Sequence, residues 1–102
     1  MAHEVFFTLS EDTAENRAHL VRECETKLSD LPGIAFFAAG TRDESIADDP
    51  NDLEFHVSLH IYFEDKASYE AYLIAPPHVA FVEENKASWA NVRVFDSQVM
   101  TY

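Results

Sequence analysis

The sequence predicts an α+β fold in which helices cover one face of a four-stranded antiparallel sheet. Four short stretches are rich in aromatic and β-branched residues, which favour strands. Two stretches between them repeat apolar residues every three or four positions, which is the period of a helix. Their order along the chain is β-α-β-β-α-β, the order of a split βαβ unit.

The length, charge and hydropathy of the chain limit the number of domains and the kinds of partner it can bind. The 102 residues suit one domain, and we expect a single domain over residues 1–102. The net charge of −12 repels phosphate backbones and anionic lipid surfaces, so we expect no nucleic-acid and no membrane partner. No stretch approaches the roughly 20 apolar residues of a membrane span, and the first residues do not resemble a signal peptide. These features favour a cytoplasmic protein.

The first strand is predicted at residues 5–9 and alternates in character. Successive side chains of a strand point to opposite faces. One face takes His3, Val5, Phe7 and Leu9, and the other takes Glu4, Phe6 and Thr8.

A helix follows, with Asp12 or Thr13 as its cap, and Pro32-Gly33 ends it. Its apolar stripe consists of Ala14, Ala18, Val21, Cys24, Leu28 and Leu31. Cys24 is the only cysteine, so the chain can form neither an intrachain disulfide nor a cysteine-based metal site. Its place on the stripe favours a buried hydrophobe over a reactive thiol.

The second strand is predicted at residues 34–39, and residues 41–52 form an acidic loop. The carboxylates of this loop lack the alternate ligand positions and the glycine turn of a calcium loop, which favours a solvated loop. The third strand, residues 55–63, alternates strictly. We expect Phe55, Val57, Leu59, Ile61 and Phe63 to face the helices, and His56, Ser58, His60 and Tyr62 to lie on the other face.

The second helix is capped by Asp65 and runs to Pro76-Pro77, where the second proline opens a further short helix. That helix carries four residues on one side: His78, Phe81, Val82 and Asn85. Trp89 follows, and the last strand is predicted at residues 92–95.

This arrangement is ferredoxin-like and leaves one face of the sheet uncovered. We expect a second copy to cover it, sheet against sheet, so that a homodimeric α/β-barrel closes by two-fold symmetry. The predicted interface residues are Phe6, His56, His60 and Tyr62. Four residues of a strand span roughly 13 Å, so His56 and His60 of one copy cannot share a metal ion. A site formed across the dimer axis stays open as an alternative, and hydrogen bonding at the interface is favoured.

Several motifs resemble the stress-responsive A/B barrel (Dabb) domain family. They are residues 72–81 with the pattern Pro-x-His-x-x-Phe, then Trp89 and residues 94–96, together with the strand that holds His3 and the helix start at residues 63–65. The resemblance runs over nearly the whole chain. It implies the fold described above and a dimer of the barrel kind.

One branch of that family includes plant olivetolic acid cyclase, which closes a ring by aldol condensation without cofactor or metal. Its tyrosine and histidine match Tyr72 and His78 here, so the resemblance implies a catalytic pair at these two positions. Most family members have no assigned reaction.

The residues themselves point to His78 as well. It follows a proline in the first turn of a helix, where unpaired amides and the positive dipole end disfavour imidazolium, so that a neutral ring can act as a base. The hydroxyl of Tyr72 can hydrogen-bond His78 or polarise a substrate carbonyl. The alternative is a buried Tyr–His hydrogen bond that only satisfies two polar atoms. The residues expected around this space are Phe7, Val57, Leu59, Phe81 and Trp89.

Two functions therefore stay open. The first is a homodimeric module with a pocket for a small apolar ligand and no assigned reaction. The second is a cofactor-free cyclase, lyase or isomerase that uses the Tyr72–His78 pair. No glycine-rich phosphate loop or flavin motif is present, so neither function calls for a cofactor.

Overall fold

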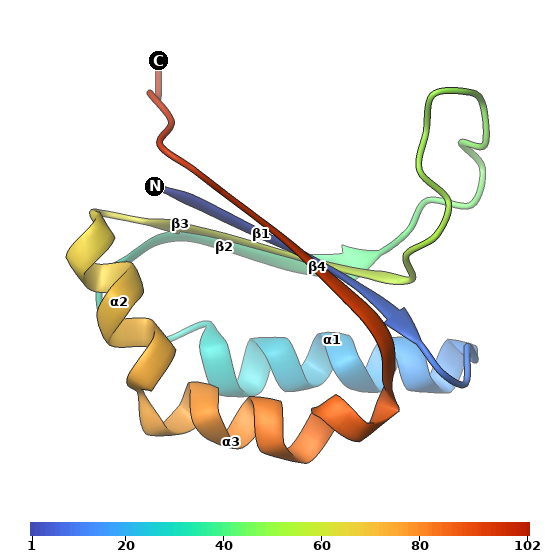
Figure 1. Ribbon diagram of the computed structural model, residues 1–102, viewed down its shortest axis with the longest axis horizontal. Helices are drawn as coiled ribbons and strands as arrows, with labels where there is room; N and C mark the ends of the chain where they lie inside the picture. Colours follow the sequence, from blue (N-terminus) through green and yellow to red (C-terminus); the bar gives the residue numbers. More distant parts are fainter.

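The computed structural model describes residues 1–102 as a four-stranded sheet with all its helices on one side (Figure 1). The strands are β1 (Ala2–Leu9), β2 (Ile34–Thr41), β3 (Val57–Phe63) and β4 (Trp89–Ser97). The helices are α1 (Ala14–Leu28), α2 (Lys66–Ile74) and α3 (Pro76–Asn85), and a 3₁₀ turn, Lys86–Ser88, joins α3 to β4. The sheet order is β2-β3-β1-β4 and every pair is antiparallel. The predicted fold class is confirmed.

The central strand β1 shows the predicted alternation. His3, Val5, Phe7 and Leu9 are buried beneath the helices, whereas Glu4, Phe6 and Thr8 are only partly covered on the opposite face. β4 pairs with β1 from Ser97 back to Trp89 and is therefore longer than the predicted residues 92–95.

Helix α1 begins after Thr13, whose hydroxyl accepts a hydrogen bond from the amide of Asn16, as the capping prediction required. Its buried side chains are Leu20, Cys24 and Leu28, which repeat every four residues. Ala14 and Ala18 are exposed, so the first part of the predicted stripe is wrong. Both line an open surface hollow together with Arg17 and Arg42. Cys24 is fully buried, and burial raises the pKa of its thiol to about 12.

The turn before β2 is fixed by Gly33, the one residue with a clearly positive φ, at 84°. A Cβ at this position would overlap the side chain of Ser68 in the first turn of α2. The carbonyl of Gly33 also accepts a hydrogen bond of 2.9 Å from the amide of Glu64. The start of α2 is thus packed directly on this turn.

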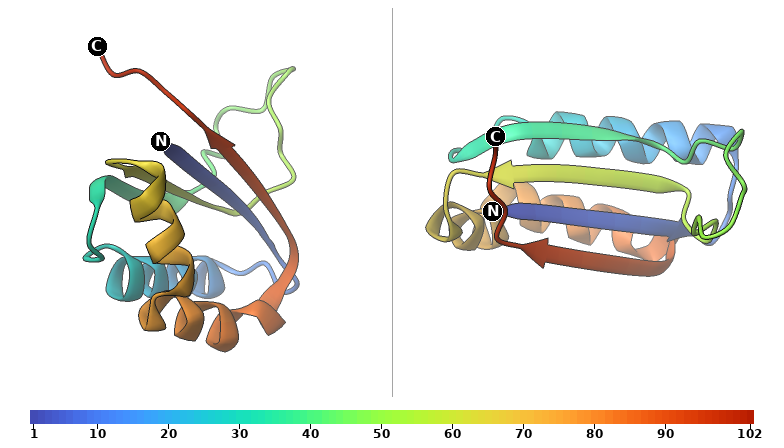
Figure 2. Two further views of the ribbon diagram at one scale, coloured as in Figure 1. Left: turned by 60° about the vertical axis from the view of Figure 1, so that its left-hand side comes forward. Right: turned by 90° about the horizontal axis from the view of Figure 1, so that it is seen from above.

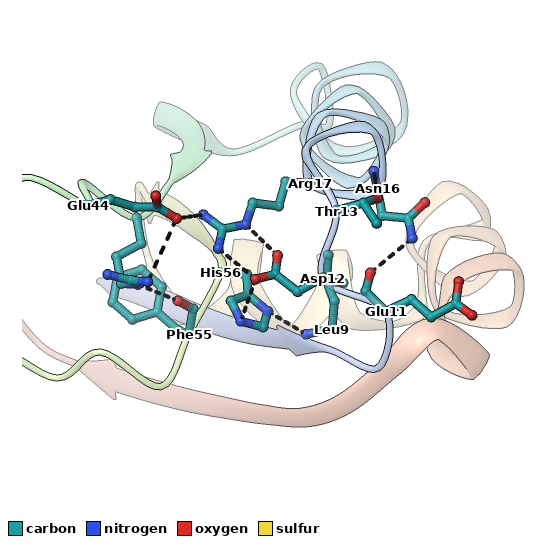
Figure 3. Close-up of polar contacts among 10 residues, drawn as sticks. Leu9, Glu11, Asp12, Thr13, Asn16, Arg17, Glu44, Phe55 and His56 are labelled. Atoms are coloured by element: carbon teal, nitrogen blue, oxygen red, sulfur yellow. Dashed lines mark hydrogen bonds and ion pairs between the residues drawn. The ribbon is translucent and has the colours of Figure 1, made fainter.

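The strict alternation predicted for residues 55–63 fails at its first two residues, because β3 begins only at Val57. The ring of Phe55 packs on Phe6, with centroids 5.0 Å apart, and so lies on the face away from the helices. His56 turns toward the start of α1, where its Nδ1 accepts the amide of Leu9 at 2.9 Å and its Nε2 lies 3.3 Å from Asp12 (Figure 3). The placement predicted for these two residues is therefore reversed.

The helical stretch after β3 breaks at the prolines as predicted. Asp65 caps α2 by accepting the amide of Ser68 at 2.8 Å. Ala75 is extended, with φ −65° and ψ 135°, since a residue before proline disfavours the helical region. Helix α3 then starts at Pro76, one residue before the predicted Pro77. No helix is long and apolar enough to cross a membrane.

The face of the sheet away from the helices has no cover of its own (Figures 1 and 2). We call it the open face. Phe36 and Phe95 are 55% and 54% exposed there. Phe36 packs edge to face on Tyr62, and Phe95 on Phe6.

Candidate functional site

A cavity of about 220 Å³ lies between the helix side of the sheet and helices α2 and α3. Thirteen residues line it, and eleven of them are hydrophobic. The lining comes from β1, β3, β4, α2 and α3, so the cavity exists only once the whole sheet and both helices are assembled. The lining residues that carry polar groups are His3, His78, Tyr69, Tyr72 and Trp89, and the indole N–H of Trp89 is buried without a hydrogen-bond partner.

Four of the five residues expected around this space do line the cavity: Phe7, Leu59, Phe81 and Trp89. Val57 does not. It is completely buried at the first position of β3, opposite Phe7, one step of the alternation away from Leu59. Residues of α2 and α3 line the cavity together with Leu59, whereas Val57 belongs to the packed hydrophobic core and does not reach the cavity.

Tyr72 and His78 face each other across the break between α2 and α3. Their ring centroids are 4.5 Å apart, and the ring planes meet at 46°. The hydrogen bond considered between them is not formed, because the Nδ1 of His78 instead pairs with the carbonyl of Leu73 at 3.0 Å. The two side chains are neighbours held by ring packing.

That contact decides the protonation pattern of His78. A carbonyl oxygen only accepts, so Nδ1 carries the proton and donates it, and in the neutral ring Nε2 is left as an acceptor. Burial lowers the pKa of His78, and the nearby His3 adds to that lowering, while the hydrogen bond to Leu73 opposes it. A neutral imidazole with a free nitrogen is a competent base.

Tyr72 is suited to donate a hydrogen bond, whereas His78 is suited to accept a proton. Tyr72 is almost fully buried, and burial raises the pKa of its phenol well above the usual value. The phenol therefore stays protonated and can donate to an oxygen of a bound molecule.

A second histidine at the cavity was not predicted as a site residue. The Nδ1 of His3 lies 2.5 Å from a carboxylate oxygen of Asp96, and the hydroxyl of Tyr69 donates to the other oxygen at 3.4 Å. The His3 ring lies 5.8 Å from that of Tyr72. Burial raises the pKa of Tyr69, and the negative charge of Asp96 raises it further.

The sequence predicts the position of His3 but not its pairing with Asp96. Alternation alone placed His3 on the helix side of β1, but its partner depends on the register of β1 against β4, in which His3 and Asp96 are direct neighbours. These two residues are 93 positions apart, so no local pattern links them.

The expected interface residues divide into two groups. Phe6, His60 and Tyr62 lie on the open face, where His60 pairs through Nδ1 with Glu4 at 3.1 Å and through Nε2 with Ser58 at 3.0 Å. His56 lies with Asp12 at the end of α1 instead (Figure 3). No group of three or more histidine, cysteine, aspartate or glutamate side chains is arranged to hold a metal ion.

The chain is similar to known proteins at the level of family and fold. The family model for the stress responsive A/B barrel domain (Dabb) matches residues 1–99. Comparison with curated proteins finds no match.

Three solved structures illustrate the likeness in fold. A Dabb family protein from Mesorhizobium loti is 24% identical, with a TM-score of 0.78 over 98% of this chain and 96% of that one. A dimeric ferredoxin-like protein of unknown function from a Jannaschia species is 22% identical, with a TM-score of 0.76 over 96% and 97%. Hydroxynitrile lyase from Passiflora edulis is 15% identical, with a TM-score of 0.74 over 98% and 95%.

Proposed function

This chain belongs to the stress-responsive A/B barrel (Dabb) domain family. On that premise we propose that it is a homodimer that binds a small, uncharged, mainly apolar ligand in the cavity beside Tyr72 and His78. The second copy covers the open face. We also propose a cytoplasmic location, which a single buried and free Cys24 fits.

One observation carries the ligand proposal: the lining of the cavity is almost entirely apolar and includes no lysine or arginine. A carboxylate or phosphate would find no cationic partner there, and the net charge of −12 would repel it on approach. The volume of about 220 Å³ is below the roughly 300–1,000 Å³ of pockets for drug-sized ligands. The ligand is therefore small and carries one or two hydrogen-bonding groups for His78 and Tyr72.

Trp89 provides the test, because it is the only tryptophan and lines the cavity. Benzyl alcohol should change its fluorescence in a saturable way, and benzoate, of nearly the same shape but charged, should do so at least about tenfold more weakly. Val82→Phe, which fills the cavity, should abolish the response. Val79→Phe, on the exposed side of the same helix, is the matched control and should leave it unchanged.

Equal responses from the two α3 variants, or equal binding of the alcohol and benzoate, would count against a ligand in this cavity. Circular dichroism of both variants establishes that they are folded before the comparison is made.

The dimer proposal rests on the open face. Aromatic side chains that pack on one another lie exposed there, and a paired Glu4 and His60 lie between them. Aromatic residues are enriched in protein interfaces relative to the rest of the surface, so this exposed cluster favours an interface. The Jannaschia relative with this fold is described as dimeric.

Sedimentation equilibrium tests the dimer directly. Phe6→Glu places a charge at the centre of the open face and should give monomers. Ile74→Glu, at a residue 79% exposed on the helix side, should leave the dimer intact. A dimer that tolerates Phe6→Glu would rule out this interface.

The site also favours a second function, cofactor-free acid–base chemistry, because His78 has a free acceptor nitrogen beside the protonated phenol of Tyr72. The likeness in fold to a hydroxynitrile lyase supplies a reaction to try. A base that removes the hydroxyl proton of mandelonitrile lets the carbon–carbon bond to cyanide break, which releases benzaldehyde and, after protonation, hydrogen cyanide. Cyanide release that His78→Ala abolishes and Val79→Ala retains would support it, and release unaffected by His78→Ala would contradict it.

A further inference from the structure

The open hollow at the start of helix α1 has a volume of about 530 Å³ and shares no lining residue with the cavity beside His78. Ala14 and Ala18 form part of its wall, and their short side chains leave the space free. The guanidinium groups of Arg17 and Arg42 also line it. The chain has only seven lysines and arginines against 19 acidic residues, so two of them at one hollow concentrate positive charge in an acidic protein.

Both guanidinium groups are held in fixed orientations. Arg17 donates from Nε and Nη2 to the two carboxylate oxygens of Asp12, at 2.6 and 2.8 Å (Figure 3). Arg42 donates from Nε to the backbone carbonyl of Phe55 at 3.0 Å. The two side chains are only 13% and 18% exposed. The entropy of these two long side chains is therefore already lost before anything binds, which favours binding.

The remaining donors of the two arginines share one exposed carboxylate. An oxygen of Glu44 lies 2.9 Å from Nη1 of Arg17 (Figure 3). The same oxygen is the one ionic partner of the terminal nitrogens of Arg42, which donate no hydrogen bond, and it lies 3.8 Å from Nη2. Glu44 is 64% exposed and belongs to the acidic loop, so its side chain can move away without disturbing the core.

We propose that this hollow binds a small organic carboxylate, and that the side chain of Glu44 occupies the position that the carboxylate of the ligand takes. Exchange of one carboxylate for another leaves the net charge of the site unchanged and supplies the hydrogen bonds that Arg42 lacks. The aliphatic part of the ligand lies against the methyl groups of Ala14 and Ala18. A phosphate dianion would instead leave a net negative charge beside Asp12, so the site favours a carboxylate.

Nuclear magnetic resonance of the arginine side chains tests the site. The Nε–H groups of Arg17 and Arg42 are both hydrogen-bonded, which slows their exchange with water and keeps their signals observable. Butyrate, titrated at constant ionic strength, should shift both signals in a saturable way. Butanol, which has the same carbon chain without the charge, should not shift them.

Two variants with matched controls identify the groups that bind. Glu44→Ala should tighten butyrate binding about fivefold, because it removes the competing carboxylate. Asp48→Ala removes an exposed acid of the same loop and should leave the affinity unchanged. Arg42→Lys keeps the charge but loses the planar fork, so it should weaken binding about tenfold. Arg22→Lys, at an exposed arginine of α1, is its control and should have no effect.

Three outcomes would each overturn the proposal. They are shifts that butanol reproduces, tighter binding of inorganic phosphate than of butyrate, and an affinity for butyrate that Glu44→Ala leaves unchanged. Circular dichroism establishes that every variant is folded. If Arg42→Lys weakens the fold, the comparison of Glu44→Ala with Asp48→Ala still decides, because both replace exposed side chains of the loop.

Discussion

The imidazole of His3 and the carboxylate of Asp96 lie 2.5 Å apart on neighbouring strands, on the side of the sheet that holds the cavity. His3 is buried, so its ring is oriented by a single acidic partner next to Tyr69 and Tyr72. The candidate site thus has two histidines held in different ways. One is fixed by a carboxylate from β4 and the other by a backbone carbonyl of α2.

Asp96→Ala should destabilise the protein by about 1–3 kcal/mol, because it leaves the buried His3 ring without its partner. Urea denaturation monitored by circular dichroism measures the change. Glu70→Ala, at an exposed acid of α2, is the control and should stay within about 0.5 kcal/mol of the wild type. A loss for Asp96→Ala no larger than the control's would mean that the pair does not hold His3.

Tyr72→Phe should change the free energy of unfolding by less than about 0.5 kcal/mol, because the Tyr72 hydroxyl forms no hydrogen bond with His78 and the ring packing is kept. The same urea titrations measure it. The substitution should nevertheless weaken the binding of benzyl alcohol. A loss of stability above about 1.5 kcal/mol would instead favour the structural alternative, in which the Tyr72 hydroxyl forms a buried hydrogen bond that only stabilises the fold.

His78 should make stability depend on pH in a defined direction. Burial lowers its pKa in the folded state below the value of 6.5, so the unfolded chain binds the proton more readily. The contribution to stability is therefore present above the unfolded pKa of 6.5 and is lost as the pH falls below it. Urea titrations from pH 7.5 to pH 5.0 should show a smaller decrease for His78→Gln than for the wild type.

His19→Gln, at an exposed histidine of α1, controls for the loss of any imidazole and should follow the wild-type profile. A His78→Gln profile parallel to the wild type's would show that the pKa of His78 is not lowered.

Gly33→Ala should destabilise the fold by about 1–3 kcal/mol, since it combines a positive φ with an overlap against Ser68. Thermal unfolding should therefore shift to lower temperature. Gly40→Ala is the matched control, because nothing lies within 4 Å of a Cβ built there. Equal midpoints for the two variants would contradict the close packing of α2 on this turn.

Features set by neighbouring residues could be predicted from the sequence alone. The alternation of β1 placed His3, Val5 and Phe7 under the helices, because successive side chains of a strand point to opposite faces wherever the strand lies. Asp65 and the two prolines fixed the start and the break of the helical stretch through their own capping and backbone preferences. Cys24 was recognised as a buried hydrophobe from its helical spacing.

Features that join distant segments were decided only by the tertiary structure. His3 meets Asp96 because β1 and β4 pair in one particular register. His56 does not lie on the expected face, because it precedes the start of β3 and its ring accepts the amide of Leu9 and pairs with Asp12. His78 bonds the carbonyl of Leu73 rather than Tyr72 across the break at Ala75, where the chain leaves α2 and enters α3. Periodicity reports which face a residue occupies, whereas the partner it meets there depends on how the elements pack, and that packing is settled by the whole core at once.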